Sequence, residues 1–180
     1  MFNSILNSKG KSDCISEMPL NDRLDYGKEA EEKVADIIQK TGQAVLPLYQ
    51  FDCDTWPFIM INDKKHVCPD LICFGSDGPY LIEVKRKQRW SMYNGKQTVA
   101  VKSKSLDFSR GLKQKTGVKI FYCFVIFGGT DINCPFDDDS EIYFQEVGSL
   151  SGRSWMGKDD MMISFNKDDL FDLSANFNNM

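Results

Sequence analysis

Several features that define common protein classes are scarce or missing in this sequence of 180 residues. His66 is the single histidine and is expected to be structural, so a zinc site with three or four convergent ligands is not expected. No cysteines form a C-x-x-C pair, and Cys73 and Cys123 lie in apolar runs, as buried reduced thiols do. The longest apolar run, Ile120 to Phe127, is too short to span a bilayer. Residues 1–20 lack the apolar core of a secretory signal, so we expect a soluble cytoplasmic protein, free or associated with the nucleoid.

Length and composition predict one domain rather than several. The chain is 42% hydrophobic and 27% charged, which is ordinary for a globular protein and argues against whole-chain disorder. Residues 1–20 are polar and show no periodicity, so they are expected to form a flexible tail. Residues 21–180 are expected to form a single domain with an acidic C-terminal extension from about residue 131.

The net charge of −4 hides a strong asymmetry along the chain. Residues 1–84 carry 8 basic against 14 acidic side chains, and residues 120–180 carry 3 against 11. Residues 85–119, the basic segment, carry 11 against 1, a net of +10. Such a block favours binding to a polyanion, whereas the plainer alternative is a solvated surface that only maintains solubility. The expected nucleic-acid contacts are Lys87, Arg89, Lys102, Lys104, Arg110 and Lys113.

Two other features of the charge pattern leave alternatives open. Trp90 and Tyr93 lie within the basic segment, where they either pack in the core or stack on bases. The acidic C-terminal third provides a docking surface for a basic protein partner in a different hypothesis, in which the chain is an assembly protein.

Periodicity and turn residues predict a mixed α/β fold. A helix is expected from Leu24 to Thr41, with Asn21 or Asp22 as its N-cap and Gly42 ending it. A second helix is expected to begin near Ser103 or Ser105 and to end at Gly117. The expected strands are Ala44–Phe51, Val67–Phe74, Tyr80–Lys85, Val118–Phe127 and, as the last strand, Glu141–Val147. This order predicts a mixed central sheet flanked by a helix on each side, with the second helix as the crossover.

The turn between two of these strands brings two carboxylates together. Gly75 to Pro79 reads as a hairpin turn, and centring it between Ser76 and Asp77 places Ile72 opposite Leu81, Phe74 opposite Pro79 and Asp70 opposite Glu83. Lys85 projects from the same face as Glu83. Two facing carboxylates repel each other unless they share a proton or a cation, and oxygen ligands suit Mg²⁺ or Mn²⁺.

The first helix contributes a third candidate acid. At 100° per residue, Glu31 falls on the shoulder of the inward face, whereas Glu29 and Glu32 point away. Gly27 lies on the inward face and is expected to allow close approach to the sheet. Glu31 is therefore expected to reach the site beneath the helix, although a surface carboxylate on the helix edge is the alternative.

These residues together resemble a known signature. Pro69-Asp70 followed by Glu83-Val84-Lys85 resembles the motif of the PD-(D/E)XK nuclease superfamily, and Gly27-x-x-Ala30-Glu31 resembles the first-helix motif of its restriction-endonuclease-like and Holliday-junction-resolvase-like branches. The stretches Glu31-Glu32-Lys33 and Asp63-Lys64-Lys65 have the same acid-x-lysine spacing but lack the strand context. The resemblance covers about Leu24 to Phe127 and implies an α-β-β-β-α-β core.

The resemblance also implies an activity, namely Mg²⁺-dependent endonuclease cleavage of DNA. Asp70 and Glu83 would bind the metal together with the Val84 carbonyl, Glu31 would be an accessory ligand, and Lys85 would position or activate the attacking water. Lys113 or Gln114 on the second helix would be auxiliary. Paired cuts in a duplex commonly need two active sites, which a homodimer would supply. The alternative is a non-catalytic nucleic-acid-binding or assembly protein with the same fold.

Overall fold

The computed structural model describes residues 20–48, 57–61, 63–127 and 140–173. Its centre is a six-stranded sheet in the order β1-β4-β5-β8-β9-β12, in which β5 and β8 are parallel and the other pairs antiparallel. The strands are β1 (Ala44–Pro47), β4 (Leu71–Gly75), β5 (Gly78–Lys87), β8 (Lys119–Ile126), β9 (Glu141–Glu146) and β12 (Phe171–Asp172). The predicted mixed sheet is confirmed.

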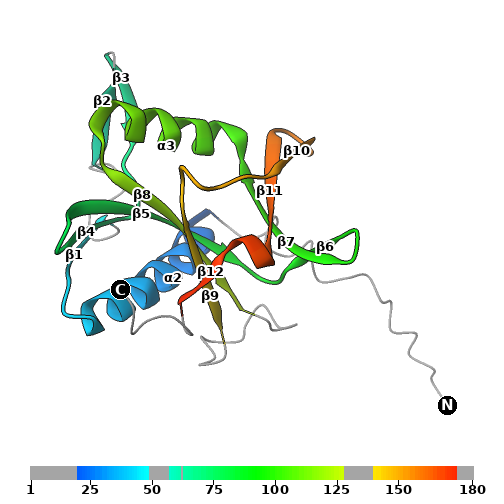
Figure 1. Ribbon diagram of the computed structural model, residues 1–180, viewed down its shortest axis with the longest axis horizontal. Helices are drawn as coiled ribbons and strands as arrows, with labels where there is room; N and C mark the ends of the chain where they lie inside the picture. Colours follow the sequence, from blue (N-terminus) through cyan, green and yellow to red (C-terminus); the bar gives the residue numbers. More distant parts are fainter. Residues whose placement is uncertain (1–19, 49–56, 62, 128–139, 174–180) are drawn as a thin grey trace.

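Two helices cover opposite faces of this sheet (Figure 1), as predicted. Helix α2 (Leu20–Lys40) buries Ala30, Val34 and Ile38 against one face, and α3 (Ser103–Thr116) buries Leu106 and Leu112 against the other. Strand β8 lies between these layers and is buried on both faces, which explains its uninterrupted apolar sequence.

The sequence predicts the C-terminal ends of both helices correctly, but it does not predict the N-terminal start of α2. The predicted stops are confirmed, because Gly42 and Gly117 adopt positive φ angles of 83° and 73°. The predicted caps are wrong: Asn21 and Asp22 lie inside α2, which begins at Leu20. In the sequence, Pro19 comes directly before that residue, and proline is favoured in the first turn of a helix, so the sequence also allows a start earlier than Asn21.

The β4–β5 hairpin has the predicted register, with Ile72 opposite Leu81 and Phe74 opposite Pro79. The predicted strand from Val67 to Phe74 is wrong as one element. It is split into β3 (Lys64–Val67) and β4, because Pro69 cannot donate a ladder hydrogen bond. Strand β3 instead pairs with β2 (Phe58–Ile61) in a separate hairpin. The first predicted strand is confirmed over Ala44 to Pro47 as an edge strand, and its residues 49–51 lie outside the described residues.

A second sheet was not predicted. Its order is β10-β11-β7-β6, formed by β6 (Ser91–Tyr93), β7 (Lys96–Lys102), β10 (Arg153–Met156) and β11 (Met161–Asn166). The connection from β5 to β8 thus contains a hairpin as well as α3, and Glu141–Glu146 is not the last strand. A short 3₁₀ helix (Lys167–Asp169) leads from β11 to β12. The second sheet lies at the opposite end of the molecule from β1 and β4 (Figure 1).

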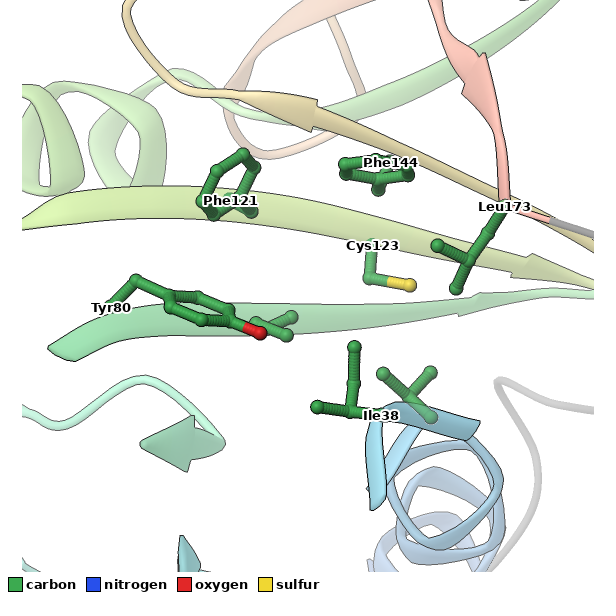
Figure 2. Close-up of a pocket in the computed structure, with 8 residues that line it drawn as sticks. Ile38, Tyr80, Phe121, Cys123, Phe144 and Leu173 are labelled. Atoms are coloured by element: carbon green, nitrogen blue, oxygen red, sulfur yellow. The ribbon is translucent and has the colours of Figure 1, made fainter. Parts of the chain in front are cut away.

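The α2 side of the core contains a small apolar pocket, shown in Figure 2. Ile38 reaches it from α2, and Cys123, Phe121 and Phe144 reach it from the sheet. Its one polar group, the Tyr80 hydroxyl, donates to Gln43 Oε1 at 2.6 Å. The pocket is therefore a packing feature of the core rather than a site for chemistry.

The structure describes the state of three cysteines and the length and polarity of the helices. Cys73 and Cys123 are buried, as predicted, and among the described cysteines these two and Cys68 are free thiols. None of the helices in the described part of the chain is both long and apolar enough to cross a membrane.

Candidate active site

The candidate site begins where β4 and β5 meet. The chain turns at Pro69 and Asp70 before entering β4, and the Asp70 backbone carbonyl accepts a hydrogen bond from the Leu48 amide at 2.9 Å. The Asp70 side chain turns toward β5, where its Oδ2 accepts a hydrogen bond from the Val84 amide at 2.7 Å. Two backbone contacts thus fix this carboxylate beside Glu83, where the predicted register places it.

Lys85 shares the site with Glu83. Its Nζ donates to Glu83 Oε1, and both side chains are largely shielded, with exposed fractions of 31% for Lys85 and 20% for Glu83. Burial lowers the pKa of Lys85, but the carboxylates of Glu83 and Asp70 raise that pKa by more, so it lies above the usual value. Lys85 is therefore a fixed cation at neutral pH.

The carboxylates of the site repel one another. Burial first, and then the charge of Glu83, raises the pKa of Asp70 well above its usual value, although the Lys85 ammonium opposes this shift. Burial and Glu83 also raise the pKa of Glu31 to about 7. Glu31 on α2 therefore lies within electrostatic reach of Glu83 and Lys85, as its position on the helix predicts.

The two other glutamates of this stretch, Glu29 and Glu32, lie at the protein surface and not in the site. Glu32 is exposed, and Glu29 accepts from Arg86 at 2.7 Å at the protein surface. The expected role of Gly27 is wrong. A Cβ placed at Gly27 would lie 3.8 Å from the Glu31 carboxylate, and no sheet atom of the described residues would lie within 4 Å of it. Gly27 therefore borders Glu31 and does not contact the sheet.

A cavity of about 270 Å³ opens over Asp70 and Glu83. The side chain of Tyr122 also lines it, because the parallel register of β5 and β8 places Tyr122 beside Glu83. The opposite wall comes from α3 and the β2–β3 hairpin, through Lys104, Ser105, Phe108, Ser109, His66 and Cys68. The sequence does not predict most of this wall, since the contact between the β2–β3 hairpin and α3 is long-range.

Two contacts set the shape of that wall. The His66 ring stacks on Phe108 with ring centroids 4.4 Å apart, which joins β3 to α3. The hydroxyls of Ser109 and Tyr122 lie 3.4 Å apart, which joins α3 to β8. His66 thus has the structural role expected of it, at a place that also lines the cavity.

The donor atoms of the site suit a hard divalent cation by their chemistry. Asp70 and Glu83 present carboxylate oxygens, and their mutual repulsion is relieved by positive charge. Yet no three His, Cys, Asp or Glu side chains among the described residues are already arranged as ligands around one point. Glu83 is instead turned to Lys85, so metal binding would require it to exchange that partner.

The six basic residues expected to contact nucleic acid differ in their partners and in their exposure. Lys102 and Lys104 are exposed near the cavity, and both pair with Asp160, at 2.8 and 3.7 Å. Arg110 donates to the Leu150 carbonyl at 2.6 Å, and Lys113 pairs with Glu146 at 2.5 Å. Lys113 therefore ties α3 to the end of β9, and Arg110 ties it to the chain that follows β9.

The remaining candidates differ in exposure. Arg89 is exposed, whereas Lys87 is partly buried, and burial followed by the charge of Lys85 lowers the pKa of Lys87 to about 8. Gln114 is exposed on α3. Trp90 packs edge-on against Tyr143 and donates to a Glu141 oxygen at 3.2 Å, which favours the packing role.

Acidic side chains of the C-terminal third have internal partners. Glu146 and Asp160 pair with lysines of the basic segment, and Glu141 accepts from Lys167 at 2.5 Å. The pairs of Glu146 and Asp160 hold the C-terminal strands against the basic segment, and the Glu141–Lys167 pair lies within the C-terminal third. Docking of a basic protein partner stays a prediction.

Comparisons with known proteins identify the fold. No protein-family model and no curated protein sequence matches this chain. Among solved structures, Hjc, a Holliday junction resolvase from the archaeal hyperthermophile Archaeoglobus fulgidus, superimposes with a TM-score of 0.52 at 11% identity, covering 86% of this chain and 98% of the resolvase. D212, a nuclease from a fusselovirus, gives a TM-score of 0.46 at 10% identity, covering 87% of this chain and 89% of that one.

The chain has a restriction-endonuclease-like fold, the fold of the Holliday junction resolvase Hjc. The prediction made from Asp70, Glu83 and Lys85 is confirmed at the level of the fold.

Proposed function

We propose that this protein is a Mg²⁺-dependent nuclease that hydrolyses phosphodiester bonds in DNA, as an endonuclease. The observation that carries the proposal is the convergence of Asp70, Glu83 and Lys85 beneath an open cavity, with Glu31 in electrostatic reach. The structural similarity to a Holliday junction resolvase supports a DNA substrate.

Asp70 and Glu83 would hold the metal, with the Val84 carbonyl and Glu31 as further oxygen ligands. A bound Mg²⁺, or Mn²⁺ in its place, supplies a water of lowered pKa and offsets negative charge on the phosphate. The Val84 amide holds Asp70 in place throughout, at 2.7 Å.

Because Lys85 stays protonated at neutral pH, only some of the roles of a catalytic lysine are open to it. Because its pKa is raised, it does not take the proton of the attacking water at neutral pH. It would orient that water and stabilise the negative charge that develops on the phosphate oxygens. We therefore favour positioning over activation for Lys85.

The exposed lysines at the start of α3 would hold the substrate backbone. Lys104 lines the cavity and its side chain is 90% exposed, so it can reach a phosphate bound over Asp70. Because the described residues contain one such cluster of Asp70, Glu83 and Lys85, we propose that a homodimer cuts both strands of a duplex.

Nicking of supercoiled plasmid tests the proposal. Wild type should nick in Mg²⁺ and stop in EDTA, and Glu83→Gln should lower the rate by about 10³-fold, because a ligand to the metal is lost. Asp77→Asn is the matched control, since Asp77 lies on the same hairpin but is exposed at its turn, and its rate should be unchanged. Nicking by Glu83→Gln at the wild-type rate would refute the proposed site, and DNA binding without Mg²⁺-dependent nicking by wild type would leave the non-catalytic alternative.

A further inference from the structure

The second sheet presents an exposed face that the proposed function does not use. Side chains at paired positions of neighbouring strands share a face. The register therefore places Arg153, Ser164 and Ala100 in one row across β10, β11 and β7, and Trp155, Met162 and Lys102 in the next row. With Tyr93 of β6, these residues define the outer face. The opposite face of the sheet buries Val99, Val101, Ile163 and Phe165 in the core.

Two aromatic rings on the outer face are exposed and held in place. Trp155 and Tyr93 are each 45% exposed. The Trp155 indole N–H donates to Ser164 Oγ at 2.6 Å, and the Arg153 guanidinium lies 4.7 Å from the centroid of the Tyr93 ring. Because these contacts fix the rings before any ligand binds, a planar ligand would lose less entropy on stacking against them.

The two central strands contribute small or medium-sized polar side chains and one alanine between the rings. Ser164 and Ala100 form one row, and Asn166 and Thr98 form the next row toward Tyr93. Arg153 extends over this region toward the Tyr93 ring. Strands in a sheet lie about 4.8 Å apart, so the outermost strands, β10 and β6, are about 14 Å apart. The outer face is therefore a platform with a ring near each end, Trp155 on β10 and Tyr93 on β6, rather than an apolar groove for a helix.

Positive charge surrounds the platform. Lys96 and Arg153 are exposed, and Lys102 is 63% exposed. Lys102 and Lys104 share one acidic partner, Asp160, and exposed ion pairs of this kind are weak in water, so phosphates can compete for the lysines. Lys104 also lines the cavity over Asp70, which makes the outer face continuous with the candidate active site.

We propose that the outer face binds an unpaired stretch of nucleic acid, with bases stacked on Trp155 and Tyr93 and phosphates on Arg153 and Lys102. Exposed rings interleaved with cations favour this ligand, because stacking uses the flat faces of bases that a duplex keeps covered. A second copy of the chain is disfavoured as the occupant, since it would bring the cations of two such faces together. The binding is independent of catalysis and extends the proposed function to substrates with unpaired segments.

Fluorescence anisotropy with a labelled oligothymidylate in EDTA tests the proposal without cleavage. Trp155→Ala and Tyr93→Ala should each weaken binding by about fivefold or more, and Trp155→Phe should restore most of it. Phe74→Ala is the matched control, because Phe74 is an equally exposed aromatic residue on β4, outside the second sheet, and it should bind as wild type. Circular dichroism melting establishes that each variant is folded.

Tryptophan fluorescence gives a second readout, which reports on the Trp155 ring directly. Oligothymidylate should quench tryptophan fluorescence of wild type, and Trp155→Phe should remove most of that quenching. Binding that depends on Arg153 and Lys102 but is unchanged in both aromatic variants would overturn the proposal, as would tighter binding of a blunt duplex than of the single strand. Self-association that Trp155→Ala abolishes would overturn it too, by assigning the face to a second copy. Loss of plasmid nicking in Glu83→Gln bears on catalysis alone and leaves this result unaffected.

Discussion

Replacing Asp70 by asparagine should abolish cleavage while leaving the metal-free protein more stable than wild type. The asparagine Oδ1 can still accept from the Val84 amide, so the local geometry is kept. The substitution removes a buried carboxylate whose pKa is raised by burial and by Glu83, so a charge that is unfavourable in the folded state disappears. We expect a loss of activity of about 10³-fold and a gain of about 1 kcal/mol in the free energy of unfolding at neutral pH.

The stability gain expected for Asp70→Asn should depend on pH in a definite direction. A carboxyl group whose folded-state pKa is raised contributes stability that is present at low pH and is lost as pH rises through the folded-state value. The advantage of Asp70→Asn over wild type should therefore grow as pH increases above the ordinary pKa of aspartate. Asp63→Asn, in the decoy acid-x-lysine stretch, should change neither activity nor this profile. Full activity in Asp70→Asn, or inactivity explained by unfolding, would contradict the account.

Replacing Lys85 by methionine should also abolish cleavage, but with the opposite effect on stability. The ammonium neutralises Glu83 and lies close enough to shift the pKa values of Asp70 and Glu31. Without it, the carboxylates face one another uncompensated in a shielded site, and we expect a loss of about 2 kcal/mol in chemical denaturation. Because Mg²⁺ would replace the missing positive charge, adding it should recover part of the loss.

Lys65→Met is the matched control for this second prediction. Lys65 is exposed and belongs to the decoy stretch Asp63-Lys64-Lys65, so its replacement should change stability by less than about 0.5 kcal/mol. Opposite signs for Asp70→Asn and Lys85→Met are the signature of a shared electrostatic site. Equal destabilisation by both would indicate ordinary packing roles instead.

The central fold follows from the sequence because its signals are local. The turn at Gly75 to Pro79 sets the β4–β5 register, which in turn places Asp70 beside Glu83. Helix periodicity places Glu31 on the shoulder of the inward face of α2, and the effect of Glu83 on the pKa of Glu31 agrees with that placement. These inferences succeed because a single turn or a single helix face determines them.

The second sheet was missed for two different reasons. Asn94-Gly95 between Tyr93 and Lys96 is a strong hairpin signal with positive φ at both residues, but the basic residues around it are equally typical of a charged surface loop. The pairing of β7 with β11 joins segments about 60 residues apart, and one sequence contains no local signal for such a partner. The wall of the cavity depends on the same kind of long-range contact, between His66 and Phe108.

The most direct measurement for the central claim is calorimetric titration of the metal-free protein with Mn²⁺. Asp70 and Glu83 should together bind a divalent cation, and Asp70→Asn and Glu83→Gln should each weaken this binding by at least about tenfold. Since Glu31 has a pKa of about 7, metal binding should release protons and should tighten as pH rises through that value. Equal affinity in wild type and both variants, or no pH dependence, would contradict a metal site at these carboxylates.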